Sequence, residues 1–298
     1  MAPVPVTPPA GRVVALPGGA AEGVAVDPVT HLVVVALRRP DRLAFVDART
    51  LLVVRVEPAP GRARHLELAA PGGPVLLPGE DTDVLVEVGL PSGAAVRRVA
   101  VGRQPHDASV VDGRVWVADE FASSVSVVAG DRVVAVLRGP VQPGGVAVDR
   151  GVVGVVDVRG GRLYLYDATT FAARGSVAVG AGPSHVVPVG GGRVVVADTR
   201  GSAVLLVDLG RRRVVARLPI PGSDYGLASD AATGDVWVTL TGRNLLVHVT
   251  TRGDVLRAVG TVATVQQPNT VAVDPSTSCL YVAGAAASQL QQVCPPRG

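Results

Sequence analysis

The sequence predicts an all-β protein, a seven-bladed β-propeller, and three observations lead to this prediction. The chain has 298 residues with 63 Val, 36 Gly and 24 Pro, a composition typical of short strands joined by tight turns. A pattern of about 41 residues occurs seven times, which indicates a repeat architecture. One strand-like segment is left over at the N-terminus, where it can complete the last repeat.

Each repeat reads as four short strands. In the copy that begins at Gly23, the first strand is GVAV, the second is LVVVAL, the third is LAFVD, and the fourth carries Arg and Val. Four-stranded units of this period describe propeller blades. The second, third and fourth strands alternate poorly between apolar and polar residues, which fits sheets buried on both faces. The other copies begin at His65, Asp107, Gly145, His185, Gly226 and Thr270.

The last copy stops after its third strand. Residues 11–18, GRVVALPG, resemble the fourth-strand text RVVARLPIPG that begins at Arg213. We therefore expect the N-terminal strand to pair into the last blade and close the ring, which removes an exposed sheet edge. Residues 1–10 are interpreted as a Pro-rich tether, and residues 11–298 as one propeller domain.

The two cysteines, Cys279 and Cys294, flank a predicted hairpin near the C-terminus. They would lie roughly opposite each other on neighbouring antiparallel strands, near disulfide distance. A disulfide indicates an oxidising compartment, so an exported protein is the favoured interpretation. Two buried free thiols and a cytoplasmic protein are the alternatives.

Composition also excludes several classes of function. All 28 basic residues are Arg, so a Lys Schiff base or a P-loop lysine is impossible. The net charge of +3 is spread along the chain and aromatic residues make up only 3%, so no nucleic-acid partner is expected. No apolar run is long enough for a transmembrane helix.

Two segments carry a resemblance to a known family. The texts QPHDASVVDGRVWVADEFASSVSVV from Gln104 and QPNTVAVDPSTSCLYVAG from Gln267 resemble YVTN-type β-propeller repeats, and the likeness extends over nearly the whole chain. The chain is also distantly similar to virginiamycin B lyase-like propellers. The resemblance implies the fold and leaves the function open, because such propellers serve as binding scaffolds, cell-surface proteins and enzymes. No catalytic residue is carried over, since the catalytic motif of the lyases has no residue-by-residue match here.

The positions where the inner strands begin should line the mouth of the central channel. They recur every 38 to 44 residues, and three of the five His in the chain occupy them. Arg39 and Glu120 lie in loops that should open on the same face. The candidate ligand-binding residues are Glu22, His65, His106, His185, Tyr225, Asn269, Arg39 and Glu120.

This arrangement leaves two functions open. The favoured one is a binding scaffold that uses the channel mouth for a small molecule, a peptide or a protein partner. The alternative is a metal-dependent lyase or hydrolase for lactones or cyclic esters. In that case His65, His106 and His185 would bind one divalent ion, because neutral imidazoles with nearby carboxylates are typical ligands. A purely structural role for the three histidines is the third interpretation.

Overall fold

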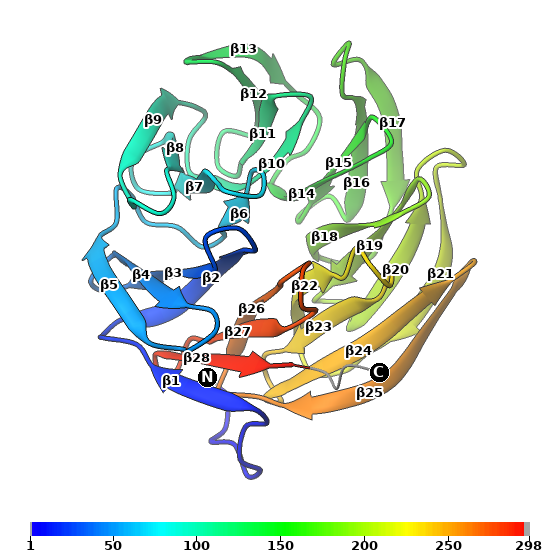
Figure 1. Cartoon of the computed structure of the whole chain (residues 1–298). Coiled ribbons are helices and arrows are strands. Elements are labelled where there is room, and N and C mark those ends of the chain that lie inside the picture. The colour runs from blue at the N-terminus through cyan, green and yellow to red at the C-terminus, as the bar shows by residue number, and fades with distance from the viewer. Residues whose placement is uncertain (1, 295–298) are drawn as a thin grey trace.

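The computed structural model describes residues 2–294 and confirms the predicted fold class. The described residues form 28 strands in seven four-stranded antiparallel sheets. The sheets stand around a central axis as the blades of a propeller (Figure 1). Residues 2–294 contain no helix, and therefore none that is long and apolar enough to cross a membrane.

Six blades follow one another along the chain, each with its first strand innermost. The strands of blades one to three are β2(Ala20–Asp27), β3(Leu32–Arg38), β4(Arg42–Asp47), β5(Val53–Pro58), β6(Glu67–Leu68), β7(Val75–Gly79), β8(Val84–Val88), β9(Ala95–Ala100), β10(Pro105–Val111), β11(Arg114–Asp119), β12(Ser124–Ala129) and β13(Arg132–Leu137). Those of blades four to six are β14(Pro143–Asp149), β15(Val152–Asp157), β16(Arg162–Asp167), β17(Ala173–Ala178), β18(Pro183–Gly190), β19(Arg193–Asp198), β20(Ala203–Asp208), β21(Arg213–Pro219), β22(Asp224–Ser229), β23(Val236–Leu240), β24(Leu245–Arg252) and β25(Val255–Ala263).

The seventh blade joins the two ends of the chain, as the leftover N-terminal strand predicts. Its strands are β26(Pro268–Val273), β27(Leu280–Gly284), β28(Gln289–Val293) and β1(Arg12–Ala15). β1 pairs antiparallel with β28 over four residues and is the outermost strand. The first and the last strand of the chain therefore belong to the same sheet (Figure 1).

The predicted disulfide is present at the end of this closing sheet. Leu280 of β27 pairs with Val293 of β28. Cys279 precedes Leu280 and Cys294 follows Val293, so the two cysteines lie side by side with their Cα atoms 4.1 Å apart. The cross-link ties Cys279 to Cys294 within the blade that holds the ring closed.

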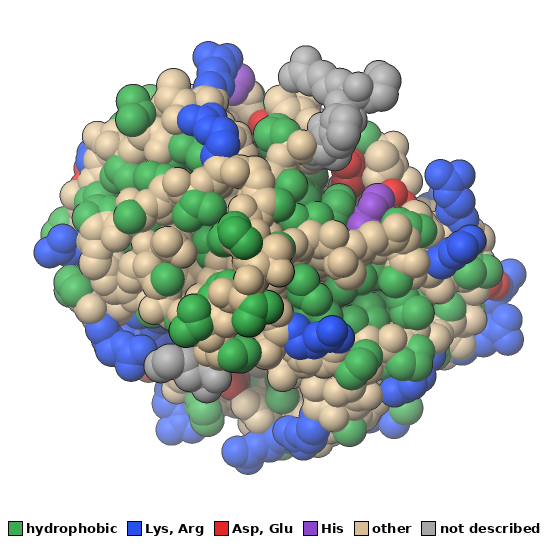
Figure 2. All heavy atoms as spheres, turned by 90° about the horizontal axis from the view of Figure 1, so that it is seen from below, with side chains coloured by type: hydrophobic (Ala, Val, Ile, Leu, Met, Phe, Trp, Pro, Cys, Tyr) green, Lys and Arg blue, Asp and Glu red, His purple; other side chains and the backbone are tan. Residues whose placement is uncertain are grey.

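The hydrophobic core lies between neighbouring blades. Strands such as β15 and β23 are buried along their whole length, because each sheet is covered on both faces by its neighbours. The outer strands are half-exposed, and β13 alternates regularly between exposed and half-buried residues. On the side of the ring shown in Figure 2, the Arg side chains are scattered among hydrophobic and uncharged atoms.

The Pro-rich segment before β1 forms no strand. It nevertheless contacts the last two blades, because Gln266 donates to the carbonyl of Ala2 (2.9 Å) and Asn244 donates to the carbonyl of Pro3 (2.8 Å). The Ala10 amide bonds to the carbonyl of Ala263. The predicted tether thus lies against the propeller.

Candidate functional site

A bulge at the start of the inner strands positions the residues of the channel mouth. In six of the seven blades the pairing between first and second strands shifts by one residue there. An unpaired bulge residue turns its side chain away from the regular alternation of the strand. The side chains at these positions can therefore point toward the axis.

The strand register corrects one expectation from the sequence. The three histidines should share one equivalent position, but they occupy two. In β10 the bulge residue is His106. In β18 that place is taken by Ser184, and His185 follows it, paired with Ala197. The spacing of the histidines along the chain could not show this, because their positions in blades three and five differ by only one residue relative to the bulge.

The strand register also places the residues of blade two. Its inner strand β6 is two residues long, and its first residue pairs with Leu76. Counting back from that pair places His65 level with His185, and the preceding Arg64 level with His106. The seven residues level with His106, one from each blade, are called the mouth layer: Glu22, Arg64, His106, Gly144, Ser184, Tyr225 and Asn269. The seven residues that follow them in sequence, level with His185, are called the second layer: Gly23, His65, Asp107, Gly145, His185, Gly226 and Thr270.

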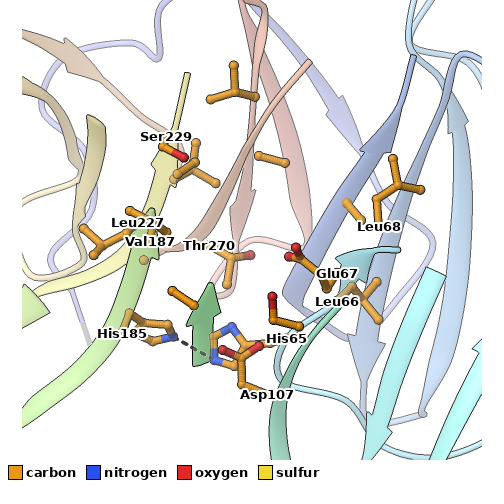
Figure 3. A pocket seen from close by; sticks show the side chains of 18 of the residues that line it. His65, Leu66, Glu67, Leu68, Asp107, His185, Val187, Leu227, Ser229 and Thr270 are labelled. Atoms are coloured by element: carbon orange, nitrogen blue, oxygen red, sulfur yellow. Dashed lines mark hydrogen bonds between the residues drawn. The ribbon is translucent and has the colours of Figure 1, made fainter. Parts of the chain in front are cut away.

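His65 and His185 meet across the axis of the channel (Figure 3). Their Nε2 atoms are 2.9 Å apart, and His185 Nδ1 lies 3.1 Å from the Ser184 hydroxyl. Ser184 contacts the Thr199 hydroxyl, which donates to the carbonyl of Asp224. Since the Thr199 proton is used on that carbonyl, Ser184 donates to Thr199 and accepts from His185 Nδ1. His185 then carries its proton on Nδ1, and His65 donates its Nε2 proton to His185.

Burial keeps the three histidines neutral. His65, His106 and His185 are each no more than 7% exposed. Removal from water lowers the pKa of His65 and His106 well below the usual value and that of His185 to about 3. The cations nearby, chiefly Arg64, act in the same direction. His106 Nδ1 is buried without a hydrogen-bond partner among the described residues.

The three imidazole rings lie close together. The ring centroids of His65 and His106 are 4.7 Å apart, and those of His106 and His185 are 6.2 Å apart. Within residues 2–294 no group of three or more His, Cys, Asp or Glu is arranged to hold a metal ion. A divalent ion on His65, His106 and His185 therefore stays a prediction of the sequence.

The other mouth residues proposed from the sequence lie around this pair. Asn269 donates to the Glu22 carboxylate, and the Thr270 hydroxyl donates to the Glu22 carbonyl, which joins blades seven and one. The Tyr225 ring stands edge-on to His185 with centroids 4.4 Å apart. Burial raises the pKa of Glu22, an effect that Arg38 and Arg64 reduce, and raises the pKa of Tyr225 to about 12.

Sequence reasoning missed Arg64, which is central to the mouth. Its Nε lies 3.1 Å from the buried Glu80 carboxylate, which also bonds Arg38 at 3.1 Å. The charge of Arg64 acts on Tyr225 and on the histidines. A regular blade would have shown the equivalence of Arg64 with His106, but the inner strand of blade two is too short to align by sequence.

Glu120 and Arg39, the two predicted loop residues, differ in their surroundings. Glu120 is 7% exposed. One of its carboxylate oxygens accepts from Gln142 (2.6 Å), and the other is buried without a partner among the described residues. Its field acts on Arg64, so it belongs to the mouth. Arg39 is exposed, and its charge acts on Glu22 at the rim.

Beyond the second layer the channel contains a cavity of about 470 Å³. His65 and His185 form its inner end, and Glu67 and Asp107 line its wall (Figure 3). Glu67 is exposed to the space of the channel but surrounded by protein. This enclosure, together with the charge of Asp107, raises the pKa of Glu67 to about 8. Burial raises the pKa of Asp107 to about 6.

Comparisons with known proteins support the fold only. No family model matches the chain, and no curated protein sequence matches it. Among solved structures, the RRP9 WD40 repeats superpose with a TM-score of 0.83 at 14% identity, covering 98% of this chain and 99% of that one. Virginiamycin B lyase from Staphylococcus aureus gives 0.80 at 10% identity, covering 95% and 98%. Hydrazine synthase from Kuenenia stuttgartiensis gives 0.78 at 14% identity, covering 95% and 97%. At these identities the chain is similar to all three in fold alone, and the YVTN resemblance stays a prediction.

Proposed function

We propose that this protein is a binding scaffold whose channel mouth holds a basic group of a ligand, such as the Arg or Lys side chain of a peptide. The WD40 repeats among its structural neighbours support a scaffold role at the level of the fold. Because fold does not determine function, the proposal depends on the chemistry of the mouth itself.

The unpartnered oxygen of Glu120 carries the proposal. A buried carboxylate oxygen without a donor costs about 1–3 kcal/mol or more. A guanidinium or ammonium group at the mouth would recover that energy with a charge-assisted hydrogen bond. Glu22 offers a second carboxylate, which accepts from Asn269 and forms no ion pair within residues 2–294. Arg38 and Arg64 are already engaged by Glu80.

An array of short peptides tests the proposal, with one central position varied among Arg, Lys, citrulline and norleucine. Citrulline has the shape of Arg without its charge. We expect the Arg and Lys peptides to bind and the citrulline peptides to bind at least about 10-fold more weakly. The double variant Glu22→Gln/Glu120→Gln should lose this preference, whereas Glu67→Gln, in the cavity beyond the histidines, should keep it. Equal binding of Arg and citrulline peptides would refute the proposal.

The disulfide supports export of the protein. Cross-links of this kind persist in oxidising compartments and are rare in the cytosol. We therefore expect no titratable thiol when the protein, isolated from its native source, is unfolded without reductant. Two titratable thiols per chain would contradict an extracellular location.

A further inference from the structure

The cavity in the channel is separate from the mouth. Its volume of about 470 Å³ lies in the range of small-molecule sites. The hydrogen-bonded His65 and His185 lie at its inner end, and the mouth residues Glu22, Arg64 and Glu120 do not line it. Its other end is lined by Ala231 and Pro275, which follow the inner strands of blades six and seven. A ligand would therefore enter from the face of the ring opposite the mouth.

Glu67 interrupts an otherwise uncharged ring in the cavity wall. It pairs with the second strand of its blade at the same place as one residue in each other blade. Those equivalent residues are small or apolar, namely Ala25, Ser109, Ala147, Val187, Ala228 and Ala272. A carboxylate at one of seven equivalent positions is not required for the blade structure, because the other six blades form without it.

The two carboxylates in the cavity have no cation among the described residues. Asp107 is held rigidly, since its two oxygens accept from the amides of Ala108 and Val146 at 2.9 Å each. This fixes it between the inner strands of blades three and four. Glu67 forms no ion pair and accepts no hydrogen bond within residues 2–294, and Asp107 is the charged group whose field acts on it. The enclosed wall thus carries two carboxyl groups and no cation within residues 2–294, and with a pKa of about 8 Glu67 becomes negatively charged in mildly alkaline solution.

Most of the other residues that line the cavity are apolar. Val110, Val187, Leu227 and Val273 line the cavity on several sides. An apolar wall with a small number of placed polar groups is the usual construction of a site for a small organic molecule. A positively charged group is the partner that two uncompensated carboxylates favour most strongly.

We propose that the channel cavity binds a small organic cation, a compact apolar body that carries one ammonium or amidinium group. The cationic group lies against Glu67 and Asp107, near the histidines, and the apolar body lies along the Val and Leu side chains. This site is independent of the mouth, because a different face of the ring admits the ligand.

Benzamidine and benzamide provide a matched pair of probes. They have nearly the same shape, and only benzamidine carries a positive charge. Calorimetric titration of the full chain in mildly alkaline buffer, where carboxyl groups are ionised, should show benzamidine binding at least about 10-fold more tightly than benzamide. Because the mouth is itself proposed to hold a basic group, the titrations are repeated in the Glu22→Gln/Glu120→Gln background, where the difference between the two probes should persist. Adding Glu67→Gln to that background should remove the difference.

A second variant keeps the test informative if Glu67→Gln changes the fold. Ser109→Leu fills the cavity at the same level and leaves both carboxylates in place, so it should weaken both probes. Thermal melts of each variant report whether the ring still folds. Equal binding of the two probes, or no binding of benzamidine, would overturn the proposal. Binding that both variants leave unchanged would place the cation elsewhere and also overturn it.

Discussion

Breaking the disulfide should weaken the ring at the blade where its two ends meet. The perturbation is the double variant Cys279→Ala/Cys294→Ala, compared with the wild type before and after reduction. The cross-link closes a loop of 15 residues. Closing a loop of this length lowers the entropy of the unfolded chain, which stabilises the folded protein by about 3 kcal/mol. Because Cys279 is buried and Cys294 is exposed, the Ala variant also loses some packing on one side only.

That free energy converts into a shift of the melting temperature. An unfolding entropy of about 2.1 cal/mol/K per residue amounts to about 0.6 kcal/mol/K for this chain. Loss of about 3 kcal/mol therefore lowers Tm by about 5 °C. Scanning calorimetry with and without reductant measures it, and the double variant, whose Tm should not respond to reductant, is the control. Oxidised and reduced wild type melting within about 1 °C of each other would refute the role of the cross-link in closing the ring.

Three further predictions concern the core and the channel. Trp116→Ala should lower the free energy of unfolding, measured by chemical denaturation, by about 3–5 kcal/mol, because the indole side chain is fully buried between blades. Gly226→Ala should destabilise the protein, since the added methyl would meet the Asn269 carbonyl oxygen at 2.4 Å, whereas Gly260→Ala has open space and should be tolerated. The third prediction concerns His185, whose folded pKa of about 3 lies below its unfolded value. Below about pH 6.5 the unfolded chain takes up the proton first, so wild type should lose about 1.4 kcal/mol per pH unit more than His185→Asn as the pH falls towards about 4. Equal pH slopes for the two proteins would show that the ring is not buried as a neutral group.

The sequence was sufficient to predict the blades because their determinants are local and repeated. Each copy repeats the same apolar strands and turn residues, so errors in one copy are corrected by the other six. The leftover strand at residues 11–18 and the pair Cys279 and Cys294 follow from the same logic, since both complete the last copy. Even so, the strand itself is shorter than its sequence suggests, Arg12–Ala15.

The candidate site could be predicted only in outline. His65, His106 and His185 do gather at one end of the channel, but a bulge residue inserted or omitted moves a side chain from one layer to the next without changing the repeat visibly. Arg64 was missed because its role depends on its ion pair with Glu80, which follows the second strand of the same blade, and on the effect of its charge on Tyr225 of blade six. Glu67 was missed because its importance comes from the small or apolar residues that the other six blades place at the same level of the channel.

Nitrogen NMR of the histidine side chains tests the arrangement of the channel most directly. Selectively labelled protein reports the protonation and tautomer of each ring. His185 should be neutral with its proton on Nδ1, His65 neutral with its proton on Nε2, and a coupling should be detected between the two Nε2 atoms across their 2.9 Å contact. Both rings should stay neutral between about pH 5 and pH 8. An imidazolium form of either ring at neutral pH, or two rings with the same tautomer, would contradict the hydrogen-bonded pair that separates the mouth from the cavity.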